Sequence, residues 1–179
     1  MKRKRIFLGL IGAVAFLSLA ASAAAQSQAS AELKDAEGKS VGIATLQEDK
    51  DGVRIEVEVK GIPAGVHGIH IHAVGKCEAP KFASAGGHFN PEKKRHGFKD
   101  VGGSHAGDLS NIYVTSVGGV YEAVTKAVTL KAGEASLLDA DGSAVVIHAA
   151  ADDYATDPAG NSGDRIACGV IMKSAPKKK

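Results

Sequence analysis

Histidines gather in residues 65–72, where His67, His70 and His72 fall within six positions of a chain that has only 7 histidines. Ile69 and Ile71 alternate with His70 and His72, and alternate side chains of a strand point to opposite faces. The spacing therefore predicts a strand whose isoleucines enter a core while its two imidazoles project together from the other face as a pair of metal ligands. The alternative is a strand whose histidines face solvent.

The other four histidines lie in or beside two long segments that show no sustained hydrophobic period. The first segment, residues 75–101, is rich in Gly, Pro, Lys and His, and the second is residues 149–164. Long loops without secondary structure are usually functional or disordered. Histidines scattered by chance would not avoid the rest of the chain, so we expect these loops and the adjoining strand ends to build one site. Its further candidate residues are His88, His96, His105, Asp108 and His148.

These residue types favour copper and zinc, which both accept imidazole as a ligand. Three histidines and one aspartate suit a tetrahedral zinc ion, and His105 and Asp108 are close enough in the chain to reach one cation from a loop. An all-imidazole site with an open position suits copper in a redox role. The sequence supplies enough ligands for both ions if one histidine is shared.

Short strands with turns between them are expected to position these residues. Residues 53–60 alternate strictly between apolar and charged side chains, as in a strand with one face in the core and one in water. Residues 26–30 are expected to be a short disordered start. Further strands are expected at residues 41–46, 69–72, 109–115, 121–130, 144–148 and 167–172. About eight strands in all predict an all-β sandwich or barrel, as a single domain over residues 26–179.

The N-terminus has the pattern of a targeting segment. Residues 2–5 are all basic, residues 6–20 are apolar apart from glycines and Ser18, and small residues at 21–25 supply a cleavage site. The apolar run is short for a membrane anchor, so we expect residues 1–25 to be a cleaved signal peptide of a periplasmic or secreted protein.

Cleavage also changes the charge of the chain. Removing four basic residues and no acidic one from totals of 22 and 20 leaves 18 and 20, a net charge of −2. The basic character therefore belongs mostly to the signal, and we expect no nucleic-acid partner and no stable membrane association. Residues 177–179 are three lysines that we expect to form a solvated end.

Two cysteines, Cys77 and Cys168, lie 91 positions apart. An even cysteine count in an exported chain predicts a disulfide. The chain-entropy model values the closure of such a loop at about 4.5 kcal/mol. The alternative is a pair of free buried thiols.

Four blocks of sequence, in this order, resemble the copper/zinc superoxide dismutases over essentially the whole mature chain. The blocks are Gly65-x-His67-Gly68-x-His70-x-His72, residues 84–91 (Ser-Ala-Gly-Gly-His-Phe-Asn-Pro), His105-x-Gly107-Asp108-Leu109 and residues 163–170 (Gly-Asp-Arg-Ile-Ala-Cys-Gly-Val). The loops are more similar to exported bacterial members than to cytosolic ones. The resemblance implies an eight-stranded Greek-key β-sandwich or barrel with two long functional loops. It also implies disproportionation of superoxide to dioxygen and hydrogen peroxide at copper.

The resemblance implies a role for each site residue. Copper would be bound by His70, His72, His88 and His148, and zinc by His88, His96, His105 and Asp108. Arg165 would attract and orient the anion, Asp152 would link a copper ligand to a zinc ligand, His67 would pin loop backbone, and Cys77 and Cys168 would form the disulfide.

Several of these roles have a plainer alternative. His96 sits in a basic run and could be a solvated loop residue, and Asp153 could take the place of Asp152. Arg165 could simply pair with a neighbouring aspartate, at position 157 or 164. A domain that only sequesters copper would be expected to lack the arginine or a ligand, and a copper-only enzyme would lack the zinc ligands. The chain could also form a homodimer.

The second loop departs from the eukaryotic members of this family, which carry a Glu-Glu-x-x-Lys cluster and a threonine there. Pro158 and Ala159 stand at the lysine and threonine positions in this chain. We therefore expect other basic residues to guide the anion, with the first-loop residues Lys93, Lys94, Arg95 and Lys99 as candidates.

Overall fold

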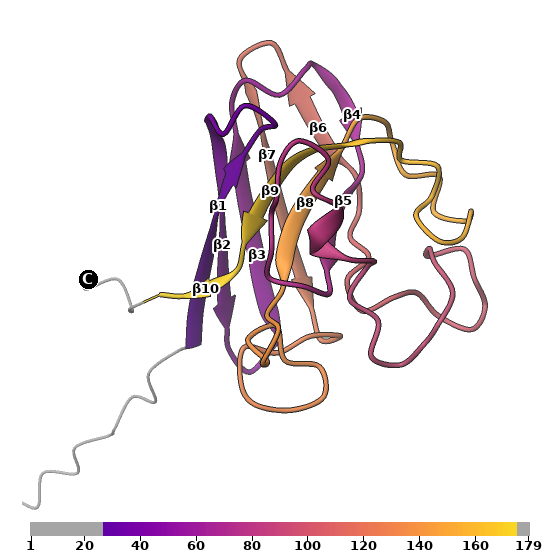
Figure 1. The fold of residues 1–179 in the computed structure, drawn as a ribbon. Coiled ribbons are helices and arrows are strands. Elements are labelled where there is room, and N and C mark those ends of the chain that lie inside the picture. The colour runs from indigo at the N-terminus through magenta and orange to yellow at the C-terminus, as the bar shows by residue number, and fades with distance from the viewer. Residues whose placement is uncertain (1–26, 175–179) are drawn as a thin grey trace, which may run out of the picture.

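The computed structural model describes residues 27–174, in which ten strands form one strongly curved sheet (Figure 1). The strands are β1 (Ser27–Lys34), β2 (Ser40–Glu48), β3 (Val53–Val59), β4 (Gly65–His67), β5 (Ile69–His72), β6 (Ile112–Thr115), β7 (Gly118–Thr125), β8 (Ala144–His148), β9 (Arg165–Val170) and β10 (Met172–Lys173). The predicted signal peptide and the three terminal lysines lie outside the described residues.

The sheet is antiparallel and nearly closes on itself. Its strand order is β4-β6-β7-β3-β2-β1-β9-β8-β5, with β10 paired to β1. Because only Gly68 separates β4 from β5 along the chain, the two ends of this order must lie next to each other. The chain passes from β3 to β4 at the end of the sheet, and β6 and β7 later occupy the two positions between them. This arrangement is a Greek key.

The predicted all-β Greek-key architecture is confirmed, with ten strands in place of the expected eight. One additional strand is β4, which precedes the expected strand at residues 69–72 and is separated from it by Gly68. The other is β10, because Ile171 interrupts the expected strand at residues 167–172 and divides β9 from β10. A Cβ atom at Gly68 would lie 2.9 Å from the Ser162 Cβ atom, so this close approach between strand and loop needs glycine.

Alternating side chains fill the barrel. Along β3, the residues Val53, Ile55, Val57 and Val59 are buried, while the charged residues between them face outward. Ile69 and Ile71 of β5 belong to the same core cluster. The binary pattern in the sequence therefore determines which face of β3 and β5 points inward.

The expected disorder of residues 26–30 is wrong for residues 27–30, which belong to β1. Their pairing with β2 begins at Ser27, which lies opposite Glu48, and Ala29 is completely buried. The small side chains of serine and alanine gave little hydrophobic alternation to recognise. Two expected strands also had incorrect ends, because β6 begins only at residue 112 and β7 already ends at residue 125.

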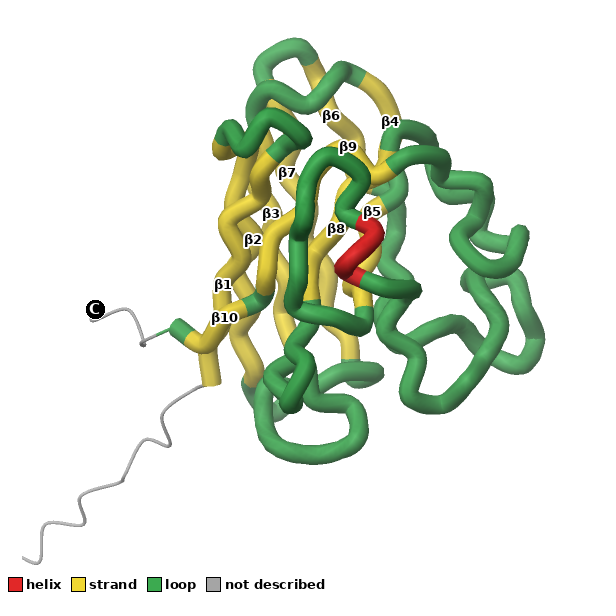
Figure 2. The backbone as a smooth tube through the Cα atoms, in the orientation of Figure 1, coloured by secondary structure: helices red, strands yellow, loops and turns green. Residues whose placement is uncertain are grey.

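The two long loops are confirmed as irregular segments, and they lie side by side at one side of the barrel (Figures 1 and 2). The Lys99 N–H donates to the carbonyl of Tyr154, and the rings of Phe98 and Tyr154 lie 5.6 Å apart. The described part of the chain contains one short 3-10 helix, η1 (Ala83–Ala85). Among residues 27–174, no helix is long and apolar enough to cross a membrane.

Candidate metal centre

The site is built on β5, whose two histidines turn away from the core. His70 and His72 are both completely buried, so the alternative of solvent-facing histidines is wrong. The first loop and the segment that follows it return to β5 and pair with its backbone. The Ile71 N–H donates to Gly107, and the Ile71 carbonyl accepts from Phe89. This pairing places His88 beside His72 and Asp108 beside His70.

Four histidine side chains converge in the first group, which consists of His70, His72, His88 and His148. Each offers one ligand atom, and these atoms lie within 4.8 Å of one another. One buried nitrogen in each ring, Nδ1 of His70 and Nε2 of the other three, has no hydrogen-bond partner among the described residues. A buried polar atom without a partner costs about 1–3 kcal/mol. Four such atoms at one place fit a cation that prefers imidazole.

In His72 and His148, the hydrogen bond made by one ring nitrogen determines which nitrogen keeps its lone pair for a metal. His72 Nδ1 donates to the Gly86 carbonyl at 2.9 Å, and His148 Nδ1 donates to the Gly163 carbonyl at 3.1 Å. A carbonyl oxygen can only accept, so the proton of each neutral ring sits on Nδ1 and the Nε2 lone pair is free. Burial lowers the pKa of His72 to about 2 and that of His148 to about 3. Both rings are therefore neutral at pH 7, as a metal requires.

The second group consists of His88, His96, His105 and Asp108, all of which are buried. Asp108 Oδ1 lies 2.8 Å from His88 Nδ1, 3.1 Å from His96 Nδ1 and 3.2 Å from His105 Nδ1. The Nδ1 atoms of His105 and His88 are 3.3 Å apart. A tetrahedral ion with bonds of about 2.0 Å holds its ligand atoms about 3.3 Å from one another. The spacing of these four atoms is therefore close to that of a zinc site.

The carboxylate of Asp108 is held in its charged form. Burial alone would raise its pKa, but hydrogen bonds from His88 and from the Gly97 N–H outweigh burial and lower the pKa to about 2. Its second oxygen, Oδ2, accepts from the N–H groups of Gly97 and His105 at 2.9 and 3.0 Å. These two bonds aim Oδ1 at the three rings.

His88 belongs to both groups through different atoms. Its Nε2 is one of the four free nitrogens of the first group, and its Nδ1 faces Asp108 in the second. Burial lowers the pKa of His88 to about 4, although Asp108 opposes this effect. A neutral or deprotonated ring between two cation sites is consistent with one histidine shared by two metals.

Asp152 joins the two groups from the second loop. Its Oδ2 accepts from His70 Nε2 at 2.7 Å, and its Oδ1 accepts from His96 Nε2 at 3.0 Å. The neighbouring Asp153 instead accepts from Thr156 and Asn161 within its own loop. Of the two aspartates, Asp152 is the one that contacts the histidine rings.

His67 and Arg165 contact backbone carbonyls. The ring nitrogens of His67 lie 2.8 Å from the carbonyl of His148 and 2.9 Å from that of Pro63, so the ring ties β4 to the end of β8. Arg165 donates through Nη1 to Phe82 and through Nη2 to Gly86, at 2.7 and 2.6 Å. No ion pair joins Arg165 to an aspartate within residues 27–174.

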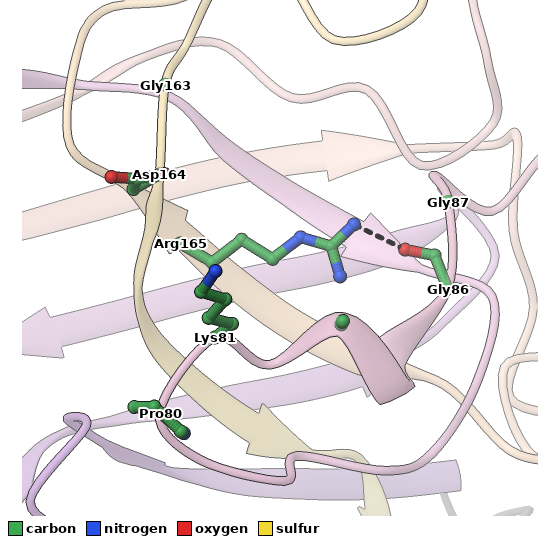
Figure 3. Close-up of a pocket in the computed structure, with 8 residues that line it drawn as sticks. Pro80, Lys81, Gly86, Gly87, Gly163, Asp164 and Arg165 are labelled. Atoms are coloured by element: carbon green, nitrogen blue, oxygen red, sulfur yellow. Dashed lines mark hydrogen bonds between the residues drawn. The ribbon is translucent and has the colours of Figure 1, made fainter.

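Arg165 lines a pocket of about 700 Å³ next to the first group (Figure 3). The carbonyl of Gly86 accepts from both Arg165 and His72, and the carbonyl of Gly163 accepts from His148. These two carbonyls connect the pocket wall to the histidine cluster. The lining residues are Pro80, Lys81, Ala83, Gly86, Gly87, Gly163, Asp164 and Arg165.

The predicted disulfide between Cys77 and Cys168 is present. It attaches the segment that leads to Phe82 and Gly86 to β9, the strand that begins with Arg165. The disulfide therefore lies close in the chain to both carbonyls that orient the guanidinium.

Sequence reasoning missed several residues that shape the site. Asn111 forms a pair of hydrogen bonds with the backbone of Asp152. Gly160 has a φ of +64°, and a Cβ atom there would overlap Oδ1 of Asp152. The hydrogen bonds to the carbonyls of Gly86 and Gly163 could not be predicted from residue type, because every residue has a backbone carbonyl. Asn111 could have been a candidate, because it lies three residues after Asp108.

Comparison with known proteins identifies the family. Residues 40–171 match the model of the copper/zinc superoxide dismutases. The chain is 48% identical over 158 residues to Cu-Zn superoxide dismutase 2 of Aquifex aeolicus, covering 87% of this chain and 92% of that protein. It is 41% identical over 147 residues to the Cu-Zn superoxide dismutase of Caulobacter vibrioides, covering 80% and 84%.

Solved structures agree with this result. The crystal structure of a double mutant of a superoxide-dismutase-like protein from Bacillus subtilis matches with a TM-score of 0.74 and 44% identity, covering 80% of this chain and 96% of that one. Together with the two adjoining groups of histidines, these matches show that the chain belongs to the copper/zinc superoxide dismutase family of oxidoreductases, whose cofactors are copper and zinc.

Proposed function

We propose that this chain disproportionates superoxide at a copper ion held by the first histidine group, beside a zinc ion held by the second. Copper would be bound by His70, His72, His88 and His148, and zinc by His88, His96, His105 and Asp108. The observation that carries the proposal is the set of four buried ring nitrogens without a partner, one of them on the ring shared with the second group. Copper, when bound, supplies the alternating uptake and release of one electron between two superoxide anions.

His88 would handle a proton in this reaction. Its Nδ1 is directed toward the second group, which leaves Nε2 as the atom that can hold a proton near the pocket. Hydrogen peroxide needs two protons for each pair of superoxide anions. With Nδ1 bound in the second group, Nε2 would be free to take up one of these protons and to release it.

Arg165 would bind and orient the anion. Burial lowers the pKa of its guanidinium, yet the group stays charged at neutral pH because its ordinary value is so high. Its two hydrogen bonds to carbonyls hold the guanidinium in the pocket wall without neutralising it, since no carboxylate pairs with it among residues 27–174. A fixed, uncompensated positive charge beside the copper group suits a small anion.

Asp152 and His67 would act as positioning residues. Asp152 orients His70 and His96, one ring from each group, so that a single carboxylate would link a copper ligand to a zinc ligand. Hydrogen bonds of this kind fix the tautomer and the angle of a ligating ring. His67 anchors the carbonyl of His148 and therefore the end of β8.

Export from the cytoplasm is part of the proposal, with residues 1–25 as the cleaved signal and residues 26–179 as the mature domain. A structural disulfide is typical of an oxidising compartment, which supports a periplasmic or secreted location. The match to an extracellular Cu-Zn superoxide dismutase of Haemonchus contortus adds support. N-terminal sequencing of the protein purified from its host would test the cleavage site.

A homodimer is also proposed. Val66 of β4 lies opposite Tyr113 of β6, and both are exposed on the outer face of the sheet together with Val120 of β7. An exposed apolar surface of this kind suits a self-complementary contact. Sedimentation of the wild-type chain and of a Tyr113→Glu variant would test it, because only the wild type should sediment as a dimer.

Metal analysis combined with a superoxide-decay assay on the mature protein tests the function. We expect one copper and one zinc per chain together with rapid superoxide decay. Bound metal without decay would leave a copper-binding protein, and decay with copper but no bound zinc would indicate a copper-only enzyme.

A further inference from the structure

Tyr154 of the second loop lies against the part of the first loop that follows His96. The Tyr154 carbonyl accepts from the Lys99 N–H at 3.1 Å, and its ring lies 5.6 Å from that of Phe98. A Cβ atom at Gly97 would lie 2.2 Å from the Tyr154 carbonyl oxygen, so this close approach needs glycine. The two loops therefore meet at Tyr154, next in the chain to a candidate zinc ligand.

The hydroxyl of Tyr154 bonds to a third segment, which follows Asp108 in the chain. This hydroxyl accepts from the backbone N–H of Asn111 at 2.8 Å, and Asn111 lies three residues after Asp108. The Asn111 side chain also donates to the Asp152 carbonyl at 2.9 Å and accepts from the Asp152 N–H at 2.8 Å. Asn111 therefore holds residues 152–154 by three hydrogen bonds, one of which depends on the tyrosine hydroxyl.

The backbone of Tyr154 orients the carboxylate of Asp152. The Tyr154 N–H donates to Asp152 Oδ1 at 2.7 Å, and the same oxygen accepts from His96 Nε2 at 3.0 Å. The other carboxylate oxygen, Oδ2, accepts from His70 in the first histidine group. The contacts of Tyr154 thus gather on the half of the site that contains His96 and Asp108.

The conformation of Tyr154 is unusual for a bulky side chain. Its φ is +62°, in the left-handed region that such residues rarely adopt. A conformation of this kind persists only where the surrounding contacts hold it. The half-buried ring supplies these contacts, because its hydroxyl bonds to Asn111 and it lies next to the ring of Phe98. Loss of the hydroxyl should therefore loosen the backbone N–H that orients Asp152.

We propose that Tyr154 is a positioning residue that retains the metal of the second group, and that it acts through Asp152 Oδ1 on the ring of His96. The inference rests on the proposed binding of zinc by this group, but it does not depend on superoxide turnover. Hydrogen-bond partners of a ligating histidine strengthen metal binding. Because Tyr154 contacts Oδ1 while Oδ2 faces His70, the tyrosine should affect zinc much more than copper.

The test is Tyr154→Phe in the protein loaded with copper and zinc, because this variant loses the hydroxyl and keeps the ring. The protein is mixed with excess EDTA at neutral pH, desalted at intervals and analysed for both metals. Zinc should leave the variant about three- to tenfold faster than the wild type, which is the effect expected from the loss of one hydrogen bond. The release of copper should change by less than about twofold.

Tyr113→Phe is the matched control, because it removes a hydroxyl from a tyrosine that lies away from both metal groups. Tyr113 is 66% exposed on the outer face of β6. This variant should release both metals at the wild-type rates. Zinc release from Tyr154→Phe at the wild-type rate would overturn the inference. An equal acceleration of zinc and copper release would also overturn it, because the hydroxyl would then support the loops in general.

Cobalt in place of zinc supplies a readout that a purely structural role would not change. The visible absorption bands of cobalt depend on the angles between its ligands, so a turned His96 ring should shift these bands in Tyr154→Phe. The absorption of copper in the variant loaded with copper and zinc should match the wild type. A wild-type chain that bound neither zinc nor cobalt would overturn the zinc assignment together with the inference. Bound cobalt with the same bands in both proteins would overturn the inference alone.

Discussion

Replacing Asp152 by asparagine should weaken the binding of both metals, because one carboxylate orients a ring in each group. Asp152 accepts from His70 through Oδ2 and from His96 through Oδ1. An amide has one oxygen that accepts and one nitrogen that donates. In either orientation, the amide of the Asp152→Asn variant would satisfy one ring and present its N–H₂ group to the N–H of the other.

The magnitude follows from the number of rings that this change affects. Removing the hydrogen-bond partner of a ligating histidine costs about 10- to 100-fold in metal affinity, or about 1.4–2.8 kcal/mol. The loss of the negative charge near both ions acts in the same direction. Burial raises the pKa of Asp152, but hydrogen bonds from His70 and His96 outweigh it and lower the pKa to about 2, so the native group is charged at neutral pH.

Competition with chelators of known affinity would measure copper and zinc dissociation constants for the Asp152→Asn protein at neutral pH. The matched control is Asp153→Asn, which makes the same change one residue away. Asp153 accepts from Thr156 and Asn161 and contacts no histidine ring among the described residues. The role assigned to Asp152 is refuted if both affinities of its variant stay within about twofold of the wild type, or if the control loses as much.

Three further perturbations have expected outcomes. Arg165→Ala should leave copper and zinc at one ion each, because the guanidinium contacts only carbonyls, but it should reduce the superoxide decay rate about tenfold or more; metal loss would contradict the assignment. Changing Cys77 and Cys168 together to serine should lower the free energy of unfolding by up to about 4.5 kcal/mol in a denaturant titration, and a loss below about 1 kcal/mol would contradict this. The metal-free protein should lose stability in acid. Burial lowers the pKa of His88 to about 4, so below pH 6.5 the unfolded chain takes up a proton that the folded chain does not. Down to about pH 4 this ring should contribute a decrease of up to about 1.4 kcal/mol per pH unit, and urea midpoints that stay constant between pH 7 and 5 would contradict it.

Much of the candidate site could be predicted from the sequence, because its candidate ligands are histidine and aspartate side chains, whose residue types point to metal binding. The alternation of Ile69 and Ile71 with His70 and His72 specified which face of β5 carries the imidazoles, and the structure has that arrangement. The fold class followed from the same period-two alternation. The strand β1 was the one that the sequence predicted least well. Its buried residue Ala29 has too small a side chain to give a clear hydrophobic alternation.

The remainder depended on contacts that residue types do not encode. The carbonyls of Gly86 and Gly163 select the tautomers of His72 and His148, and any residue type could have provided a carbonyl. Which lysine of the first loop borders the pocket likewise depends on the fold, since Lys81 lines it and Lys93 does not. That arrangement is set by the path of the disulfide-anchored segment rather than by local sequence.

The division of the ligands into two groups that share His88 is the central claim, and anomalous diffraction from crystals of the metal-loaded protein tests it most directly. Data collected on either side of the copper and zinc absorption edges distinguish the two ions. We expect a copper peak that contacts Nδ1 of His70 and the Nε2 atoms of His72, His88 and His148. We also expect a separate zinc peak at His88 Nδ1, His96, His105 and Asp108. A single metal peak, or two peaks that share no histidine, would contradict the claim.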